Sequence, residues 1–173
     1  GCGRRRPEVD KTEVKSVSAA QMGADMTAGC ILLIFLIFFG DLWIKERVER
    51  EMPMGQEKEL LGGRLLLRRH HNRGAMLNLG QGRRSFVAAL SLTLTVLIAV
   101  LFVVSLGHRG NRLLRVGLAL LLGGAFSNTY DRLKRKYVVD YLSFGVRWKG
   151  LRRIVFNVSD FCILIGAMLS ALG

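Results

Sequence analysis

Residues 123–160 read GGAFSNTYDRLKRKYVVDYLSFGVRWKGLRRIVFNVSD. This stretch leaves one apolar segment, crosses a basic loop and enters another, with Asp131, Asp140 and Asp160 at or near the segment ends. Because ionisable groups at membrane depth are costly, such acids indicate function. Two carboxylates that meet can share one proton, as the activation of water by a pair of aspartates requires. We therefore expect Asp140 and Asp160 to form a catalytic pair.

The composition around this stretch is that of a membrane protein. Half of the 173 residues are hydrophobic, and long runs carry no charge. The net charge of +13 would suggest nucleic acid in a soluble protein, but here the basic residues alternate with apolar segments, so we expect contact with anionic membrane lipids instead. No zinc-finger spacing, RNA-binding aromatic motif or phosphate-binding glycine loop occurs. The cysteines are three in number, Cys2, Cys30 and Cys162, and the last two lie in apolar runs, so we expect neither a disulfide framework nor a metal site.

The apolar runs predict a membrane all-α fold with four transmembrane helices. Their expected spans are 28–44, 86–106, 113–130 and 154–172. Gly117, Gly123, Gly124 and small residues of the last span predict close helix packing.

The domain division follows from the position of the first span. Residues 26–173 form the four-span domain, whereas the polar residues 1–25 predict a flexible tail. Because the chain begins with glycine, we expect the residues before Met22 or Met26 to be a cloning remnant or a non-essential extension.

Two polar segments, 45–85 and 131–154, predict a small subdomain of strands and loops outside the hydrocarbon core of the membrane. Within them we expect a helical extension up to a break at Pro53 and an extended segment over 138–144. Four spans place both termini on one side of the membrane. The aspartates and the 45–85 segment then meet on the other side.

Five motifs follow one another in the chain. The first is D-x-x-T-K, with Asp41, Lys45 and Ile44 in place of threonine, and the second is N-x-G-A-A-F, with Asn72, Gly74 and Ala75, from which Met76 and Leu77 depart. The third is G-G-A-x-x-N-x-x-D-R, with Gly123, Gly124, Ala125, Asn128, Asp131 and Arg132. The fourth is V-V-D-F, with Val139, Asp140 and Tyr141, and the fifth is F-N-x-A-D, with Phe156, Asn157, Asp160 and Ser159 in place of alanine. Over roughly residues 30–173, this ordered set resembles the lipoprotein signal peptidases (signal peptidase II), which are membrane aspartic proteases.

The resemblance assigns roles to these residues. It implies that Asp140 and Asp160 are the catalytic pair, with no metal and no cofactor. The residues expected to bind substrate are Asn72, Asn128, Arg132 and Asn157. For Asn128 and Asn157, orientation of the acids and hydrogen bonding between helices are the alternatives. The supporting residues are Asp131, Gly74, Asp41 and Lys45, of which the last two are four apart and predict an ion pair or a lipid-headgroup contact.

Other residues that carry chemistry in enzymes are given structural roles. We expect His70 and His71 to be exposed loop residues. Ser127 and Ser159 lack an evident lysine or histidine partner, which argues against a serine nucleophile.

By resemblance, the substrate is a prolipoprotein with a diacylglyceryl-modified cysteine, cut just before that cysteine, and globomycin-type compounds inhibit the reaction. The implied location is the bacterial cytoplasmic membrane, with the active site at the extracytoplasmic face and both termini cytoplasmic. The charge distribution opposes this orientation, because 18 of the 26 lysines and arginines lie on the expected catalytic side. The alternative functions are a small transporter or proton-relay subunit, and a non-catalytic membrane scaffold.

Overall fold

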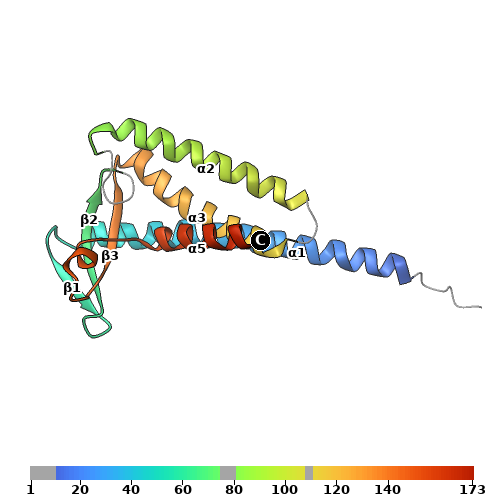
Figure 1. The fold of residues 1–173 in the computed structure, drawn as a ribbon, viewed down its shortest axis with the longest axis horizontal. Coiled ribbons are helices and arrows are strands. Elements are labelled where there is room, and N and C mark those ends of the chain that lie inside the picture. The colour runs from blue at the N-terminus through green and yellow to red at the C-terminus, as the bar shows by residue number, and fades with distance from the viewer. Residues whose placement is uncertain (1–10, 75–80, 108–110) are drawn as a thin grey trace, which may run out of the picture.

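Four long helices lie alongside one another and carry a three-stranded sheet at one end (Figure 1). The structure, a computed structural model, describes residues 11–74, 81–107 and 111–173. The helices are α1 (Lys11–Glu51), α2 (Arg84–Gly107), α3 (Arg112–Lys134), the short α4 (Lys149–Arg152) and α5 (Val158–Leu172), with a 3-10 turn η2 (Gln81–Arg83). The strands are β1 (Glu57–Leu60), β2 (Leu65–Asn72) and β3 (Val138–Phe144).

Helix α1 corrects the expected flexible tail. Its 41 residues begin at Lys11, so residues 11–25 are helical, while residues 1–10 lie outside the described residues. Once the apolar part is helical, each added residue gains a hydrogen bond without a new nucleation step. The helix ends at Glu51, before Pro53, as expected, because proline disfavours a helical conformation in the preceding residue.

Two of the helices, residues 20–51 and α2, are long and apolar enough to cross a membrane. Helix α3 has 23 residues, but Arg112, Arg115, Asp131 and Arg132 make it more polar. Helix α5 is apolar and has 15 residues. It begins at Val158 rather than near Ile154 as expected, because the backbone of Phe156 instead pairs with that of Leu142 of β3.

Small residues let α3 and α5 approach closely, as the sequence predicts. A Cβ atom built on Gly166 would lie 2.6 Å from the carbonyl oxygen of Gly117 and 2.6 Å from the amide nitrogen of Leu121. A Cβ on Gly124 would lie 2.5 Å from the carbonyl oxygen of Ser159. The glycines therefore set the distance between α3, which carries the third motif, and α5, which begins within the fifth motif.

The sheet has the order β1-β2-β3 and is antiparallel throughout. Strand β3 matches the extended segment expected over 138–144. Between Leu67 and His70 the register of β2 against β3 shifts, and beyond this irregularity His70 lies opposite Asp140. A hydrophobic cluster of Val48, Met52, Val139 and Tyr141 joins the end of α1 to the sheet.

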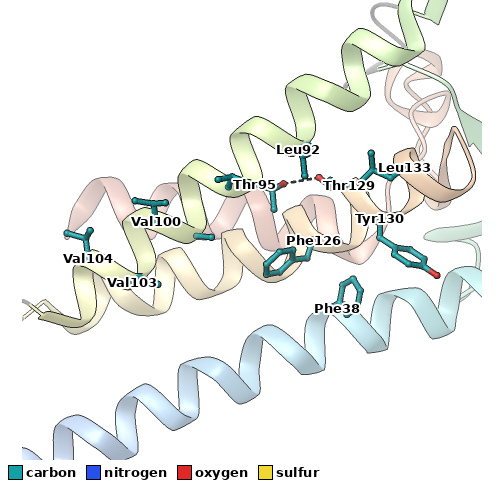
Figure 2. A pocket seen from close by; sticks show the side chains of 12 residues that line it. Phe38, Leu92, Thr95, Val100, Val103, Val104, Phe126, Thr129, Tyr130 and Leu133 are labelled. Carbon is teal, nitrogen blue, oxygen red and sulfur yellow. Dashed lines mark hydrogen bonds between the residues drawn. The ribbon is translucent and has the colours of Figure 1, made fainter.

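Helix α2 is held to α3 by a pair of threonines. The hydroxyl oxygens of Thr95 and Thr129 are 2.8 Å apart (Figure 2). Thr95 also donates to the carbonyl of Ser91. On one side of this pair an apolar groove of about 530 Å³ lies between α2, α3 and Phe38 of α1 (Figure 2). The groove contains none of the motif aspartates.

Candidate active site

A second cavity, of about 420 Å³, contains the motif residues. Its walls are mainly apolar side chains of α2, α3 and α5. Its polar lining residues include Asn72, Asn128, Arg132, Asp140 and Asp160. A mostly apolar cavity with a few convergent polar groups is the usual form of a binding site in proteins.

Asp140 reaches this cavity from the middle of β3 and is 2% exposed. Its Oδ2 atom accepts a hydrogen bond of 3.1 Å from the amide of Asn72 on β2. Its Oδ1 atom accepts one of 2.8 Å from the side chain of Asn157. Both oxygens of this carboxyl group are therefore held by amide donors.

Asp160 is positioned by the start of α5. Asn157 is the N-cap residue, and its side-chain oxygen accepts from the amide N–H of Asp160 at 2.9 Å. The carboxylate of Asp160 accepts in return from the amide N–H of Asn157 at 3.0 Å, which completes a capping box. Asn128 of α3 donates to the other carboxylate oxygen at 2.9 Å.

Asn157 joins the two acids. Its side chain donates to Asp140, and its backbone donates to Asp160. The carboxyl groups also interact with each other electrostatically. The helix cap thus brings together the acids expected to form a pair, although they come from a strand and a helix.

Three asparagines share one arrangement. In each, a donor fixes the side-chain oxygen, so the NH₂ group points to a carboxylate. The donors are the amide N–H of Gly74 for Asn72, Lys45 for Asn128 and the amide N–H of Asp160 for Asn157. For both Asn128 and Asn157 these hydrogen bonds display orientation of the acids, and those of Asn128 also connect helix α3 to α1 and α5.

Arg132 lies beside the same cavity. Its guanidinium donates to the carbonyl of Asn128 at 3.3 Å and to that of Gly74 at 3.4 Å. It also interacts electrostatically with Asp160, Asp140 and Asp131. The side chain thus provides positive charge next to both acids.

A buried ion cluster lies behind the acids. Lys45 is fully buried and contacts Asp41 at 2.7 Å and Asp131 at 3.2 Å. The Asp41–Lys45 ion pair expected from their spacing is present, and its burial rules out the alternative of a headgroup contact. Asp131 also accepts from the amide N–H of Val139, which ties α3 to β3.

Lys45 also corrects the expectation for Ser127. The ammonium group donates to the hydroxyl of Ser127 at 2.9 Å, so this serine does have a lysine partner. The hydroxyl in turn donates to Asp41 at 2.6 Å, and Ser127 is fully buried. Ser159 likewise donates to Asp41, so both hydroxyls serve the ion cluster.

Tyr141 is a member of this cluster that sequence reasoning missed. Its hydroxyl donates to Asp41 at 2.7 Å and accepts from the amide N–H of Val158 at 3.1 Å. Burial and the nearby Asp41 raise the pKa of Tyr141, which keeps the hydroxyl neutral and able to donate. The signal was the tyrosine in place of phenylalanine in the fourth motif, because it adds one polar group at a buried position.

The two histidines lie in strand β2 rather than in a loop, which corrects their expected placement. His71 contacts Glu49 of α1 at 2.6 Å and stacks on Tyr137. The Nδ1 atom of His70 is 3.9 Å from the Oδ2 atom of Asp140. The pairing of β2 with β3 brings His70 next to Asp140. The sequence motifs do not predict the register of this pairing.

Within the described ranges, no group of three or more metal-ligating side chains is present. The residues Ala75, Met76 and Leu77 of the second motif lie outside the described residues. Asn72 and Gly74 of that motif are described, and Gly74 is buried beside Arg132.

The sequence has relatives among known proteins. A sequence profile described as signal peptidase (SPase) II matches residues 33–173. Lipoprotein signal peptidases of Anoxybacillus flavithermus and Symbiobacterium thermophilum are 32% and 34% identical to the chain; the alignments cover 80% and 79% of this chain and 80% and 87% of those proteins. The lipoprotein signal peptidase of Bacillus subtilis is 30% identical, over 80% of this chain and 87% of its own length.

The fold has counterparts among solved structures. A bacterial membrane enzyme solved by the in meso method at 2.3 Å resolution matches with a TM-score of 0.72 and 24% identity, over 84% of this chain and 86% of that one. A second bacterial membrane enzyme, solved at 1.9 Å resolution, matches with a TM-score of 0.69 and the same identity, over 84% of this chain and 91% of that one.

Proposed function

The chain belongs to the signal peptidase II family, and we propose that it removes signal peptides from prolipoproteins with Asp140 and Asp160 as its catalytic pair. One observation carries the assignment of the pair. Among the described residues, these carboxylates line the same cavity and are joined by the side chain and backbone of Asn157.

The proposed reaction is hydrolysis of one peptide bond by general acid–base catalysis. The two acids hold one proton between them. The ionised acid takes a proton from water, and the resulting hydroxide attacks the scissile carbonyl carbon. The protonated acid gives its proton to the developing oxyanion or to the leaving amine. Arg132, close to both acids, stabilises the negative charge that develops.

The shape of the cavity supports a lipid-modified substrate. Its apolar walls extend from the acids along α2 and α5, with Leu94, Ile98 and Leu164 among the lining residues. In our proposal this part receives apolar chains of the substrate, while Asn72 and Arg132 face the peptide near the cut. The cut then falls just before the lipidated cysteine, and globomycin-type inhibitors compete for the same cavity.

We also propose that α1, α2, α3 and α5 are four transmembrane helices, with the sheet and the acids at the extracytoplasmic face of the bacterial cytoplasmic membrane and both termini in the cytoplasm. In this arrangement the strands and the 131–154 segment form the extracytoplasmic subdomain, and the described residues of the 1–25 segment extend α1 into the cytoplasm. Leu61 and Trp148 are exposed and lie outside the four long helices, and Trp148 is next to Arg147 in the chain and accepts a backbone hydrogen bond from Arg152. Such a surface suits contact with lipid headgroups.

Of the rival functions, a transporter or proton-relay subunit would place its acids near the middle of the helices. Asp140 instead lies in the sheet, and Asp160 lies in the first turn of α5. A non-catalytic scaffold would not need either carboxyl group.

The test is lipoprotein processing in bacterial cells whose own signal peptidase II is depleted. We expect Asp140→Asn and Asp160→Asn each to leave prolipoprotein uncut at normal protein levels. Asp25→Asn changes an exposed aspartate of α1 far from the site and is the matched control. Normal processing by either active-site variant would show that the pair is wrongly assigned.

A further inference from the structure

His70 lies directly opposite Asp140 in the antiparallel pairing of β2 with β3. The Nδ1 atom of His70 is 3.9 Å from the Oδ2 atom of Asp140. This nitrogen is buried and finds no hydrogen-bond partner among the residues that the structure describes. At 3.9 Å the contact is too long for a hydrogen bond, but it is close enough for a charged imidazole to attract a carboxylate.

The alternation of strand β2 separates the two histidines. Side chains of successive strand residues point to opposite faces, so His70 and Asn72 share one face, and both contact the Oδ2 atom of Asp140. His71 points the other way, to Glu49 and Tyr137. The strand therefore supplies one histidine to the catalytic aspartate and another to the joint between sheet and helix α1.

His70 is not among the described residues that line the catalytic cavity. It approaches Asp140 from beside the cavity, and its side chain is 40% exposed. A residue in this position acts on the aspartate without touching the peptide that is cut.

Two other cationic side chains near the acids, Arg132 and Lys45, do not interact with Asp140 alone. Arg132 of α3 interacts with both Asp160 and Asp140. Lys45 of α1 acts on Asp160, but its charge is balanced by direct contacts with Asp41 and Asp131. The contact of His70, in contrast, is with Asp140.

Resting on the proposed function, we propose that His70 is a positioning residue that, when protonated, keeps the negative charge on Asp140 and leaves the shared proton on Asp160. Asp140 is then the base that takes the proton from water, and Asp160 is the acid that supplies one. A positive charge 3.9 Å from the Oδ2 atom of Asp140 stabilises the ionised form of that carboxyl group.

The experiment measures kcat/KM against pH with the purified full chain in detergent and a synthetic lipopeptide that carries a diacylglyceryl cysteine. In His70→Gln we expect the acidic limb of the profile to move upward by about 0.5 to 1 pH unit. In His70→Lys, which keeps a positive charge, the limb should lie at or below that of the wild type. His71→Gln, one residue away and turned to Glu49, should leave the limb in place.

The outcomes separate this proposal from the proposed function. Cleavage by the wild type that Asp140→Asn abolishes supports the proposed function whatever His70 does. A His70→Gln profile that superimposes on the wild type, or that falls equally at every pH, overturns the role of His70. If His70→Gln melts at a lower temperature than the wild type, the His70→Lys profile distinguishes a charge effect from a structural one. A lysine would not restore the acidic limb of the pH profile if the role of His70 were purely structural, and that result would overturn the proposal.

Discussion

The ammonium group of Lys45 donates a hydrogen bond of 2.9 Å to the side-chain oxygen of Asn128. Lys45 has donors only, so it fixes which end of the amide faces it, and the NH₂ group of Asn128 must turn to Asp160. The buried ion cluster behind the site therefore reaches the carboxylate of Asp160, the proposed catalytic acid, through one side chain.

Asn157 has two tasks that a substitution can separate. Serine caps helices about as well as asparagine, but its hydroxyl cannot cap α5 and also reach Asp140. We expect Asn157→Ser to melt near the wild-type temperature while kcat falls by about 100-fold, the lower end of what a positioned acid or base contributes to general acid–base catalysis. Asn157→Ala should lower both quantities, and full activity in Asn157→Ser would contradict the orienting role.

Lys45 neutralises two buried aspartates, Asp41 and Asp131. Replacing it in Lys45→Met leaves Asp41 buried without a cation and leaves Asp131 only its 3.5 Å contact with Arg135, which should lower the free energy of unfolding by about 3–5 kcal/mol. Thermal unfolding in detergent micelles measures this change. Arg47→Met is the control, because the Arg47–Glu51 pair is about half exposed and should change stability by less than about 1 kcal/mol.

Gly166 sets the distance between α3 and α5. In Gly166→Ala the new methyl group meets the backbone of Gly117 and Leu121 at 2.6 Å, and these atoms cannot move aside without shifting a helix. We expect a loss of about 1–3 kcal/mol in stability, together with reduced activity, because α5 carries Asp160. In Gly40→Ala no described atom lies within 4 Å of the added Cβ, so this variant should be as stable as the wild type or more so. Equal melting temperatures for the two variants would contradict the packing argument.

The proposed topology can be tested by thiol labelling in intact cells. In a variant without native cysteines, Lys58→Cys in the exposed strand β1 should react with a membrane-impermeant maleimide from outside. Arg112→Cys, at the other end of the bundle, should react only after lysis. The reverse pattern would follow the positive-inside rule and place the acids in the cytoplasm.

Much of this protein is determined locally by its sequence. The apolar runs locate α2 and most of α1, α3 and α5, since the length of an uncharged segment is a local property. The five motifs identify the family and select Asp140 and Asp160, because the order of short motifs is read along the chain. Strand β3 and the end of α1 before Pro53 follow from local alternation and from proline chemistry.

Only the tertiary structure determines which of the polar side chains are in contact. The register of β2 against β3 brings His70 and Asn72 into contact with Asp140. The alternation of side chains along either strand does not predict that register. The packing of α3 against α1 and α5 turns Ser127 and Ser159 toward Asp41 rather than toward a substrate. The physical reason is that burial removes water from these polar groups, so each must find its partner among residues that are distant in the chain.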